Sequence, residues 1–228
     1  MRVLGVIGGM GPAATFDFCS RLTAAMPVRR DQDHPRILVD CDPSVPDRNA
    51  AASNAGPDPG PHIARMASGL VQRGADILAM PCNAAHACRP EIERVAPGRL
   101  IDMIEASALE ATANGANRIG VLAADGCLRA GLYQRAIVAR GAQVVRLEPQ
   151  DQARFMELIY RIKSGDAGLQ VRDAMRALAG RLASDGADAV IAGCTEAPLV
   201  LDAGDVPAPY VSCTDALVRA VIARLGAP

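Results

Sequence analysis

The sequence predicts an α/β fold of two similar Rossmann-like lobes, each a mainly parallel sheet with flanking helices. Two observations support this class. Short runs rich in Val, Ile and Leu alternate with longer Ala- and Arg-rich stretches, as strands and helices do in parallel α/β proteins. The motifs of the first half also recur in the second half at nearly constant spacing. The recurrence indicates an internal duplication.

The first half alternates between predicted strands and helices. Strands are expected at 3–7, 37–39, 77–80 and near 100–101, and helices at 12–25, 63–73, near Glu91 and at 104–114. A strand at 119–122 starts the pattern again. The stretch 45–61 is rich in Pro, Asn, Asp and Gly, so it predicts a long loop, a kind of segment that is often functional.

The duplication is visible in two pairs of segments. Gly-Ala-Asp, an apolar strand and a cysteine follow one another at 74–82 and again at 186–194. The glycine-bounded segment at 5–11 recurs at 120–126. Two anchors with similar offsets predict a cleft between two related lobes, with one cysteine contributed by each lobe.

The lobes are expected at 1–103 and 104–210, with a C-terminal helix at about 211–228 that returns to the first lobe. Half of the 228 residues are hydrophobic, which is enough for a sizeable core. Aromatic residues make up only 3% and Trp is absent, so Ala, Val, Leu and Ile must build that core.

Charge and composition argue against several classes of protein. A formal net charge of −1 does not favour nucleic acid as a partner, and the apolar runs are too short to span a membrane. The first residues lack the pattern of a signal peptide, so a cytoplasmic location is expected. Seven cysteines without CxxC spacing and three scattered histidines predict neither a disulfide framework nor a metal site.

Cys82 and Cys194 are the candidate reactive residues. Each follows an apolar strand, at the edge of a parallel sheet where ligands bind. Each is expected to open a helix whose N-terminus lowers the thiol pKa, and Asn83 and Thr195 suit the N-cap position. A lone cysteine in an apolar strand is usually structural, whereas a matched pair in duplicated halves favours function.

Two opposed thiols can invert a stereocentre without a metal. One thiolate removes a proton from one face of a carbon, and the other thiol returns a proton to the opposite face. The two groups must differ in protonation when the substrate binds, so they should titrate as a coupled pair. This chemistry predicts a racemase.

Motifs along nearly the whole chain resemble the aspartate/glutamate racemase family, and they are most similar to its aspartate racemase branch. They are GVIGGMGPAAT at 5–15, VPDRN at 45–49, PCNAAH at 81–86, IYRIKSG at 159–165 and GCTE at 193–196. The resemblance implies a cofactor-independent racemase with its active site between the lobes, commonly a homodimer. It also implies that Cys82 and Cys194 are the acid/base residues.

The resemblance assigns substrate contacts as well. Arg48, whose guanidinium can bind a carboxylate bidentately, and Lys163, the only lysine in the chain, are expected to contact the side-chain carboxylate. Glu196 is expected to orient the amine or a thiol. The α-carboxylate is expected to contact four further residues, which are Met10, Gly11, Asn83 and Thr195.

Two departures from the family pattern leave the substrate open. Ala84 stands where the family usually has Thr, and 123–127 reads AADGC where Ala-Thr-x-Gly-Thr is usual. Aspartate and glutamate differ by one methylene, which is worth only about 1–3 kcal/mol of discrimination. A racemase or isomerase of another 2-substituted acid and a non-catalytic amino-acid sensor remain alternatives.

A dinucleotide site is a weaker alternative. Residues 9–14 read G-x-G-x-x-A after a predicted strand, and Asp40 ends the next strand. The separation from Gly11 to Asp40 exceeds the usual one of about 20 residues, and this interpretation leaves the paired cysteines unexplained. The same turn can bind a substrate carboxylate through its N–H groups.

Overall fold

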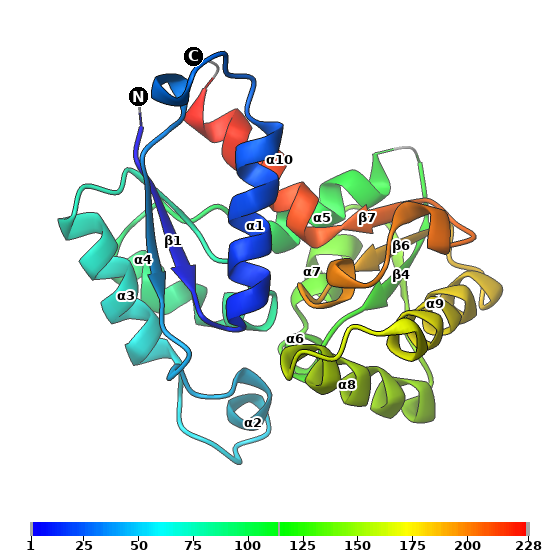
Figure 1. The fold of residues 1–228 in the computed structure, drawn as a ribbon. Helices are drawn as coiled ribbons and strands as arrows, with labels where there is room; N and C mark the ends of the chain where they lie inside the picture. The colour runs from blue at the N-terminus through cyan, green and yellow to red at the C-terminus, as the bar shows by residue number, and fades with distance from the viewer. Residues whose placement is uncertain (1, 114, 227–228) are drawn as a thin grey trace.

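A computed structural model describes residues 2–113 and 115–226 and confirms the predicted fold class (Figure 1). Two parallel sheets, each flanked by helices, form the two lobes. The helix expected at 104–114 is present as α5 (Met103–Thr112), and residue 114 of that expectation lies outside the described residues. Residues 227–228 of the expected C-terminal helix lie outside them as well.

The first lobe contains a parallel sheet with the strand order β2-β1-β3. Its strands are β1 (Leu4–Gly8), β2 (Ile37–Cys41) and β3 (Ile77–Ala79). Leu100 extends the sheet by a single parallel bridge to Leu78. All five residues of β1 are buried, as expected for the central strand of a parallel sheet that is covered on both faces.

The second lobe repeats this arrangement. Its strand order is β5-β4-β6-β7, with β4 (Arg118–Leu122) and β6 (Ala189–Ala192) central and β5 (Gln143–Val145) and β7 (Tyr210–Ser212) at the edges. β4 therefore corresponds to β1, and β6 corresponds to β3. Both cysteine motifs follow matched strands, as the duplication predicts.

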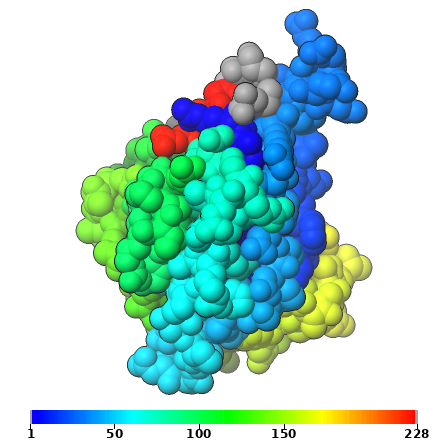
Figure 2. Space-filling model, turned by 90° about the vertical axis from the view of Figure 1, so that its left-hand side faces the viewer, coloured from blue at the N-terminus to red at the C-terminus, as the bar shows by residue number. Residues whose placement is uncertain are grey.

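Helices cover both faces of each sheet. Those of the first lobe are α1 (Pro12–Ala25), α2 (Arg48–Ala52), α3 (Gly60–Gln72) and α4 (Arg89–Val95). After α5 come α6 (Asp125–Arg129), α7 (Leu132–Val138), α8 (Pro149–Lys163), α9 (Leu169–Ser184) and α10 (Cys213–Leu225). Short 3₁₀ helices lie at Asp31–Asp33, Ala84–Cys88, Ala197–Leu199 and Ala203–Asp205. The face shown in Figure 2 is formed largely by the cyan and teal segment that contains α3 and α4.

Two helices cross between the lobes. α5 leaves the first sheet and packs on β6 and β7 of the second, whereas α10 leaves β7 and packs on α1 and β3 of the first. α5 and α10 also pack against each other (Figure 1). One hydrophobic cluster consequently includes Val6 of the first sheet, Val121 of the second and Leu217 of α10.

Local signals explain where the crossing helices begin. The side chain of Asp102 accepts hydrogen bonds from the N–H groups of Ile104 and Glu105 and caps α5. The hydroxyl of Ser212 accepts one from the N–H group of Asp215 and caps α10.

The stretch 45–61 is not a continuous loop, which corrects the sequence prediction. It contains the short helix α2 (Arg48–Ala52), because the Asp47 side chain accepts hydrogen bonds from the N–H groups of Asn49 and Ala50. The alanines that follow have high helix propensity. Because Arg48 is the first residue of this helix, the helix fixes the backbone conformation of Arg48.

Replacing Gly9 by Ala tests the turn that follows β1. Gly9 has φ +93°, and an added Cβ would lie 2.3 Å from the backbone carbonyl of Asp42. We expect Gly9→Ala to lower the free energy of unfolding by about 2–3 kcal/mol in urea titrations. Gly204→Ala, at an exposed position with nothing near its Cβ, should change it by less than about 0.5 kcal/mol. Equal stability of the two variants would contradict the geometry described for this turn.

Candidate active site

A cavity of about 500 Å³ lies between loops of the first lobe and elements of the second. The first lobe contributes the β1–α1 turn and the β2–α2 loop. The second lobe contributes the end of α8 and the segment after β6. The polar and glycine residues of its wall include Gly9, Gly11, Ser44, Arg48, Lys163 and Glu196. Four of the residues predicted from the sequence therefore line one cavity.

Cys82 and Cys194 are both buried, each shortly after its strand. The expected capped helices after them do not form. The first cysteine is followed by a 3₁₀ helix that begins after Asn83, and the second by one that begins after Glu196, and neither has a side-chain cap. Thr195 does not serve as an N-cap because the helix begins after Glu196, one residue later, and its hydroxyl lies beside the Glu196 carboxylate instead.

The Cys194 thiol lies in a chain of polar contacts. Its Sγ donates a hydrogen bond to Oε2 of Glu196 over 3.0 Å, and Oε1 of Glu196 lies 3.6 Å from Nζ of Lys163. The Glu196 carboxylate is nearly completely buried, and its Oε1 has no hydrogen-bond partner among the described residues. Burying a carboxylate is costly unless an opposite charge lies close, which Lys163 supplies.

Cys194 has a raised pKa, which corrects the low pKa that the sequence predicted for this thiol. Burial raises the pKa of Cys194 well above its ordinary value, and the Glu196 carboxylate raises it further, whereas Lys163 opposes the rise. Burial alone lowers the pKa of Lys163, but the charge of the nearby Glu196 carboxylate outweighs burial and raises it. Cys194 is therefore a protonated thiol at neutral pH.

Arg48 lies on the opposite side of the cavity. Its guanidinium donates hydrogen bonds to three backbone carbonyls, those of Val45, Pro46 and Met10, at 2.9–3.2 Å. These contacts hold the group between the β2–α2 loop and the β1–α1 turn. A guanidinium has five N–H donors, so donors remain for a carboxylate at the cavity surface.

The β1–α1 turn is fixed by one side chain. The hydroxyl of Thr15 accepts a hydrogen bond from the N–H group of Gly9 and donates one to the carbonyl of Gly11, both at 3.0 Å. Met10 is buried, and Gly11 faces the cavity near Oε1 of Glu196. The turn thereby brings backbone of the first lobe close to the Glu196 carboxylate of the second.

Asn83 does not present its side chain to the cavity. Its Oδ1 accepts a hydrogen bond from the hydroxyl of Tyr133 at 2.7 Å, and its Nδ2 donates to Sγ of Cys213 at 3.2 Å. Thr195 is also buried, with its hydroxyl 3.5 Å from Glu196. Tyr133 was not predicted as a site residue, although it is one of only three tyrosines in the chain.

His86 supports the first cysteine loop. Its Nδ1 donates to the carbonyl of Cys82 at 2.9 Å, and its Nε2 accepts from the N–H group of Met103 at 3.3 Å. Burial lowers the pKa of His86, so the ring is neutral. The ring links the Cys82 loop to the start of α5.

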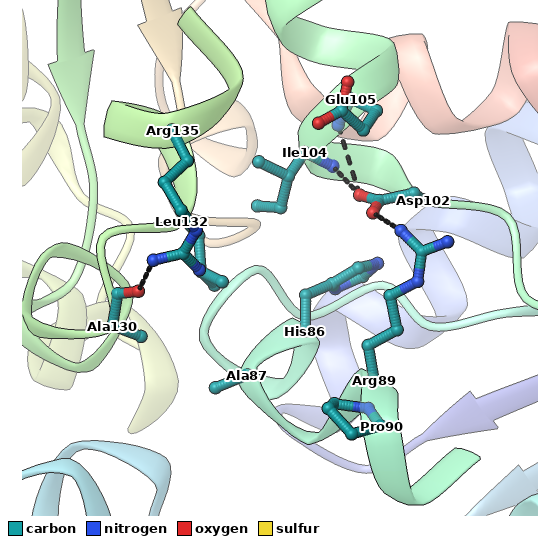
Figure 3. A pocket seen from close by; sticks show the side chains of 10 residues that line it. All are labelled: His86, Ala87, Arg89, Pro90, Asp102, Ile104, Glu105, Ala130, Leu132 and Arg135. Atoms are coloured by element: carbon teal, nitrogen blue, oxygen red, sulfur yellow. Dashed lines mark hydrogen bonds and ion pairs between the residues drawn. The ribbon is translucent and has the colours of Figure 1, made fainter. Parts of the chain in front are cut away.

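A second cavity, of about 330 Å³, borders His86 but lies outside this site (Figure 3). Its charged groups are paired within the protein. Arg89 contacts Asp102 at 2.5 Å, and Arg135 donates to the carbonyl of Ala130 at 2.7 Å. The lining of this second cavity does not include Cys82, Cys194, Arg48, Lys163 or Glu196.

The described residues contain no group of three or more His, Cys, Asp or Glu side chains that could hold a metal ion. Within residues 2–113 and 115–226, no helix has the length and apolar character needed to cross a membrane. All seven cysteines are free thiols.

Comparison with known proteins identifies the family. The family model for Asp/Glu/hydantoin racemases matches residues 7–221. The chain is 25% identical to the broad specificity amino-acid racemase RacX of Bacillus subtilis over 96% of each chain. It is 34% identical to the glutamate racemase of Pseudomonas paraeruginosa over 60% of this chain, which corresponds to 51% of that enzyme.

Solved structures agree with this assignment. The Picrophilus torridus aspartate racemase superposes with a TM-score of 0.88 at 27% identity, covering 98% of this chain and 94% of that one. The glutamate racemase from Francisella tularensis shares the fold, with a TM-score of 0.75 at 17% identity, 98% of this chain and 81% of that one. The chain therefore belongs to the Asp/Glu/hydantoin racemase family, and it is an isomerase.

Proposed function

We propose that the protein inverts Cα of a small acidic amino acid, aspartate in the first place and glutamate in the second, by proton transfer between Cys82 and Cys194. The observation that carries this proposal is the position of the two thiols. Cys194 contacts the Glu196–Lys163 pair at the cavity wall, and Cys82 follows the matched strand β3 of the other lobe. A substrate beside Lys163 would lie near the Cys194 thiol, and Cys82 is proposed to face it from the other lobe.

The transfer is balanced between the two cysteines. The Cys82 thiolate takes the α-proton, so the Cα–H bond breaks and an S–H bond forms, and the electron pair is held on Cα and the α-carboxylate. The Cys194 thiol then gives its proton to the opposite face and becomes the thiolate. Its raised pKa favours the protonated starting state. The opposite enantiomer reacts by the same steps with the roles exchanged.

Charged groups around the cavity would orient the substrate. Arg48 and Lys163 are proposed to neutralise the side-chain carboxylate. The α-carboxylate is proposed to bind Thr195 and the backbone at Met10 and Gly11. Oε1 of Glu196 has no hydrogen-bond partner among the described residues and would be an acceptor for the α-ammonium group. Asn83 would act only through its backbone, because both ends of its amide are already paired.

A wider range of amino acids is a second candidate function. Ala84, in place of the expected hydroxyl residue, lines a cavity of about 250 Å³ that also borders Arg48 and Gly126. The room beside Arg48 favours side chains other than a short carboxylate. One relative of similar length is named as a broad specificity amino-acid racemase, which supports this candidate. The cytoplasmic location and the homodimer stay predictions, and sedimentation velocity tests the latter.

Removing either thiol should slow inversion strongly. We expect Cys82→Ala and Cys194→Ala each to slow inversion of aspartate or glutamate by about 10²–10⁴-fold, measured by NMR and circular dichroism in D₂O. Residual α-proton exchange should be confined to one enantiomer, and to the other enantiomer in the other variant. Cys19→Ala, at a half-buried thiol on α1, is the matched control.

Three results would contradict the two-thiol proposal. Inversion at an unchanged rate in either single variant would exclude it, and so would a loss of equal size in Cys19→Ala. Tight binding of these amino acids to the unmodified protein, without α-proton exchange, would favour the sensor instead. A parallel assay with other amino acids separates narrow from broad specificity.

The pH at which Cys194 becomes reactive should shift in opposite directions in two variants. Glu196 raises the pKa of Cys194 and Lys163 lowers it. Glu196→Gln should therefore move the alkylation midpoint of Cys194 to lower pH, and Lys163→Gln should move it to higher pH. Peptide mass spectrometry after iodoacetamide pulses measures both. Glu157→Gln, at an exposed carboxylate on α8, should leave the midpoint unchanged, and shifts of the same sign in the first two variants would exclude the electrostatic account.

A further inference from the structure

Tyr133 reaches the Cys82 motif from the other lobe. It belongs to α7 of the second lobe and is completely buried. Its hydroxyl donates a 2.7 Å hydrogen bond to Oδ1 of Asn83, the residue that follows Cys82. One tyrosine of the second lobe thus holds the first cysteine loop by a direct polar contact.

The ring of Tyr133 also packs against the Cys194 motif. A Cβ added to Gly193, the residue before Cys194, would lie 2.6 Å from Cε2 of the ring and 3.1 Å from Cζ. Real Cβ atoms do not approach so closely, so the ring occupies the space that a side chain at position 193 would need. The matching position before Cys82 is Pro81, which shows that the motif itself does not require glycine there.

The contact with Asn83 has a defined direction. Nδ2 of Asn83 donates to Sγ of Cys213 at the start of α10, which leaves Oδ1 as the acceptor for the tyrosine hydroxyl. Burial raises the pKa of Tyr133 well above its ordinary value, so the phenol keeps its proton and stays a donor. Tyr133, Asn83 and Cys213 therefore form a buried polar network between α7, the Cys82 loop and α10.

We propose that Tyr133 is a positioning residue that sets the separation of the two reactive thiols, because a single side chain contacts the neighbours of both Cys82 and Cys194. This inference rests on the proposed two-thiol racemisation. Proton transfer requires the donor and the acceptor to lie close to Cα on both faces at once, and a shift of about 1 Å can cost about 100-fold in rate. The groups proposed to bind substrate, Arg48 and Lys163, do not depend on this network.

Tyr133→Phe tests the proposal with a small change. The ring remains and the hydrogen bond to Asn83 is lost, so we expect kcat to fall about 10- to 100-fold while KM changes by less than about twofold. In D₂O, deuterium uptake into the unconverted enantiomer should rise relative to inversion, because the carbanion waits longer for the second thiol. Tyr210→Phe is the control, since its half-buried hydroxyl donates to the carbonyl of Leu201 and makes no hydrogen bond to the Cys82 or Cys194 motif among the described residues. It should leave kcat within about twofold.

Gly193→Ala tests the ring contact separately. The added methyl must displace the ring or the Cys194 loop, so kcat should again fall with KM nearly unchanged. A positioning role is overturned if Tyr133→Phe keeps the kcat of the unmodified protein and is no less thermally stable than Tyr210→Phe. It is also overturned if both variants at positions 133 and 193 change KM alone.

A readout that does not need turnover separates this proposal from the proposed function. Pulsed iodoacetamide labelling with peptide mass spectrometry gives the reaction rates of Cys82 and Cys194 in the folded protein. Tyr133→Phe should change both rates at least threefold, and Tyr210→Phe neither. If the unmodified protein racemises no amino acid, the proposed function fails. The labelling rates alone then decide whether Tyr133 positions both thiols. Unchanged labelling rates in Tyr133→Phe overturn the positioning role.

Discussion

The packing of α5 against α10 between the two sheets is the contact on which the rest of the structure depends. Each helix leaves one sheet and covers the other, so the cluster between the sheets is shared, whereas the outer face of each sheet has a cluster of its own lobe. The shared cluster buries apolar side chains from both sheets, and burial of this kind is the main favourable contribution to folding. The two cysteine loops are consequently held in one body.

The polar site follows from this arrangement. The carboxyl ends of parallel strands lie at one edge of each sheet, so the β1–α1 turn, the Arg48 loop and the segment after β6 surround a common cavity. Burial makes the charges in this region interact strongly. The Lys163–Glu196 pair is tolerated because each group neutralises the other. Burial, with the Glu196 carboxylate, keeps Cys194 a protonated donor by raising its pKa, and Lys163 offsets only part of that rise.

Much of the fold and part of the site could be predicted from the sequence. The equal spacing of the two cysteine motifs predicted matched strands, and β3 and β6 are those strands. The glycine-rich turn and the single lysine pointed to Gly11 and Lys163, which line one cavity. These features could be predicted because they are local, and periodicity, repeats and unusual residue choice are visible in the sequence itself.

The contacts between side chains of different lobes could not be predicted in this way. The pairing of Asn83 with Tyr133 and Cys213 depends on how α7 and α10 meet the first cysteine loop. The same holds for the thiol pKa: the sequence suggested a helix N-terminus, whereas the structure has short 3₁₀ turns and a buried carboxylate beside Cys194. The helix α2 escaped prediction because the prolines and glycines around it dominate the composition of its segment.

The most direct measurement of the central claim is a crystal structure of the protein with bound D- or L-aspartate. The account predicts that Cα lies between Sγ of Cys82 and Sγ of Cys194, on opposite faces and at about 3–3.5 Å from each. The side-chain carboxylate should face Arg48 and Lys163. Aspartate bound in the cavity beside His86, or with both sulfur atoms on the same face of Cα, would contradict it.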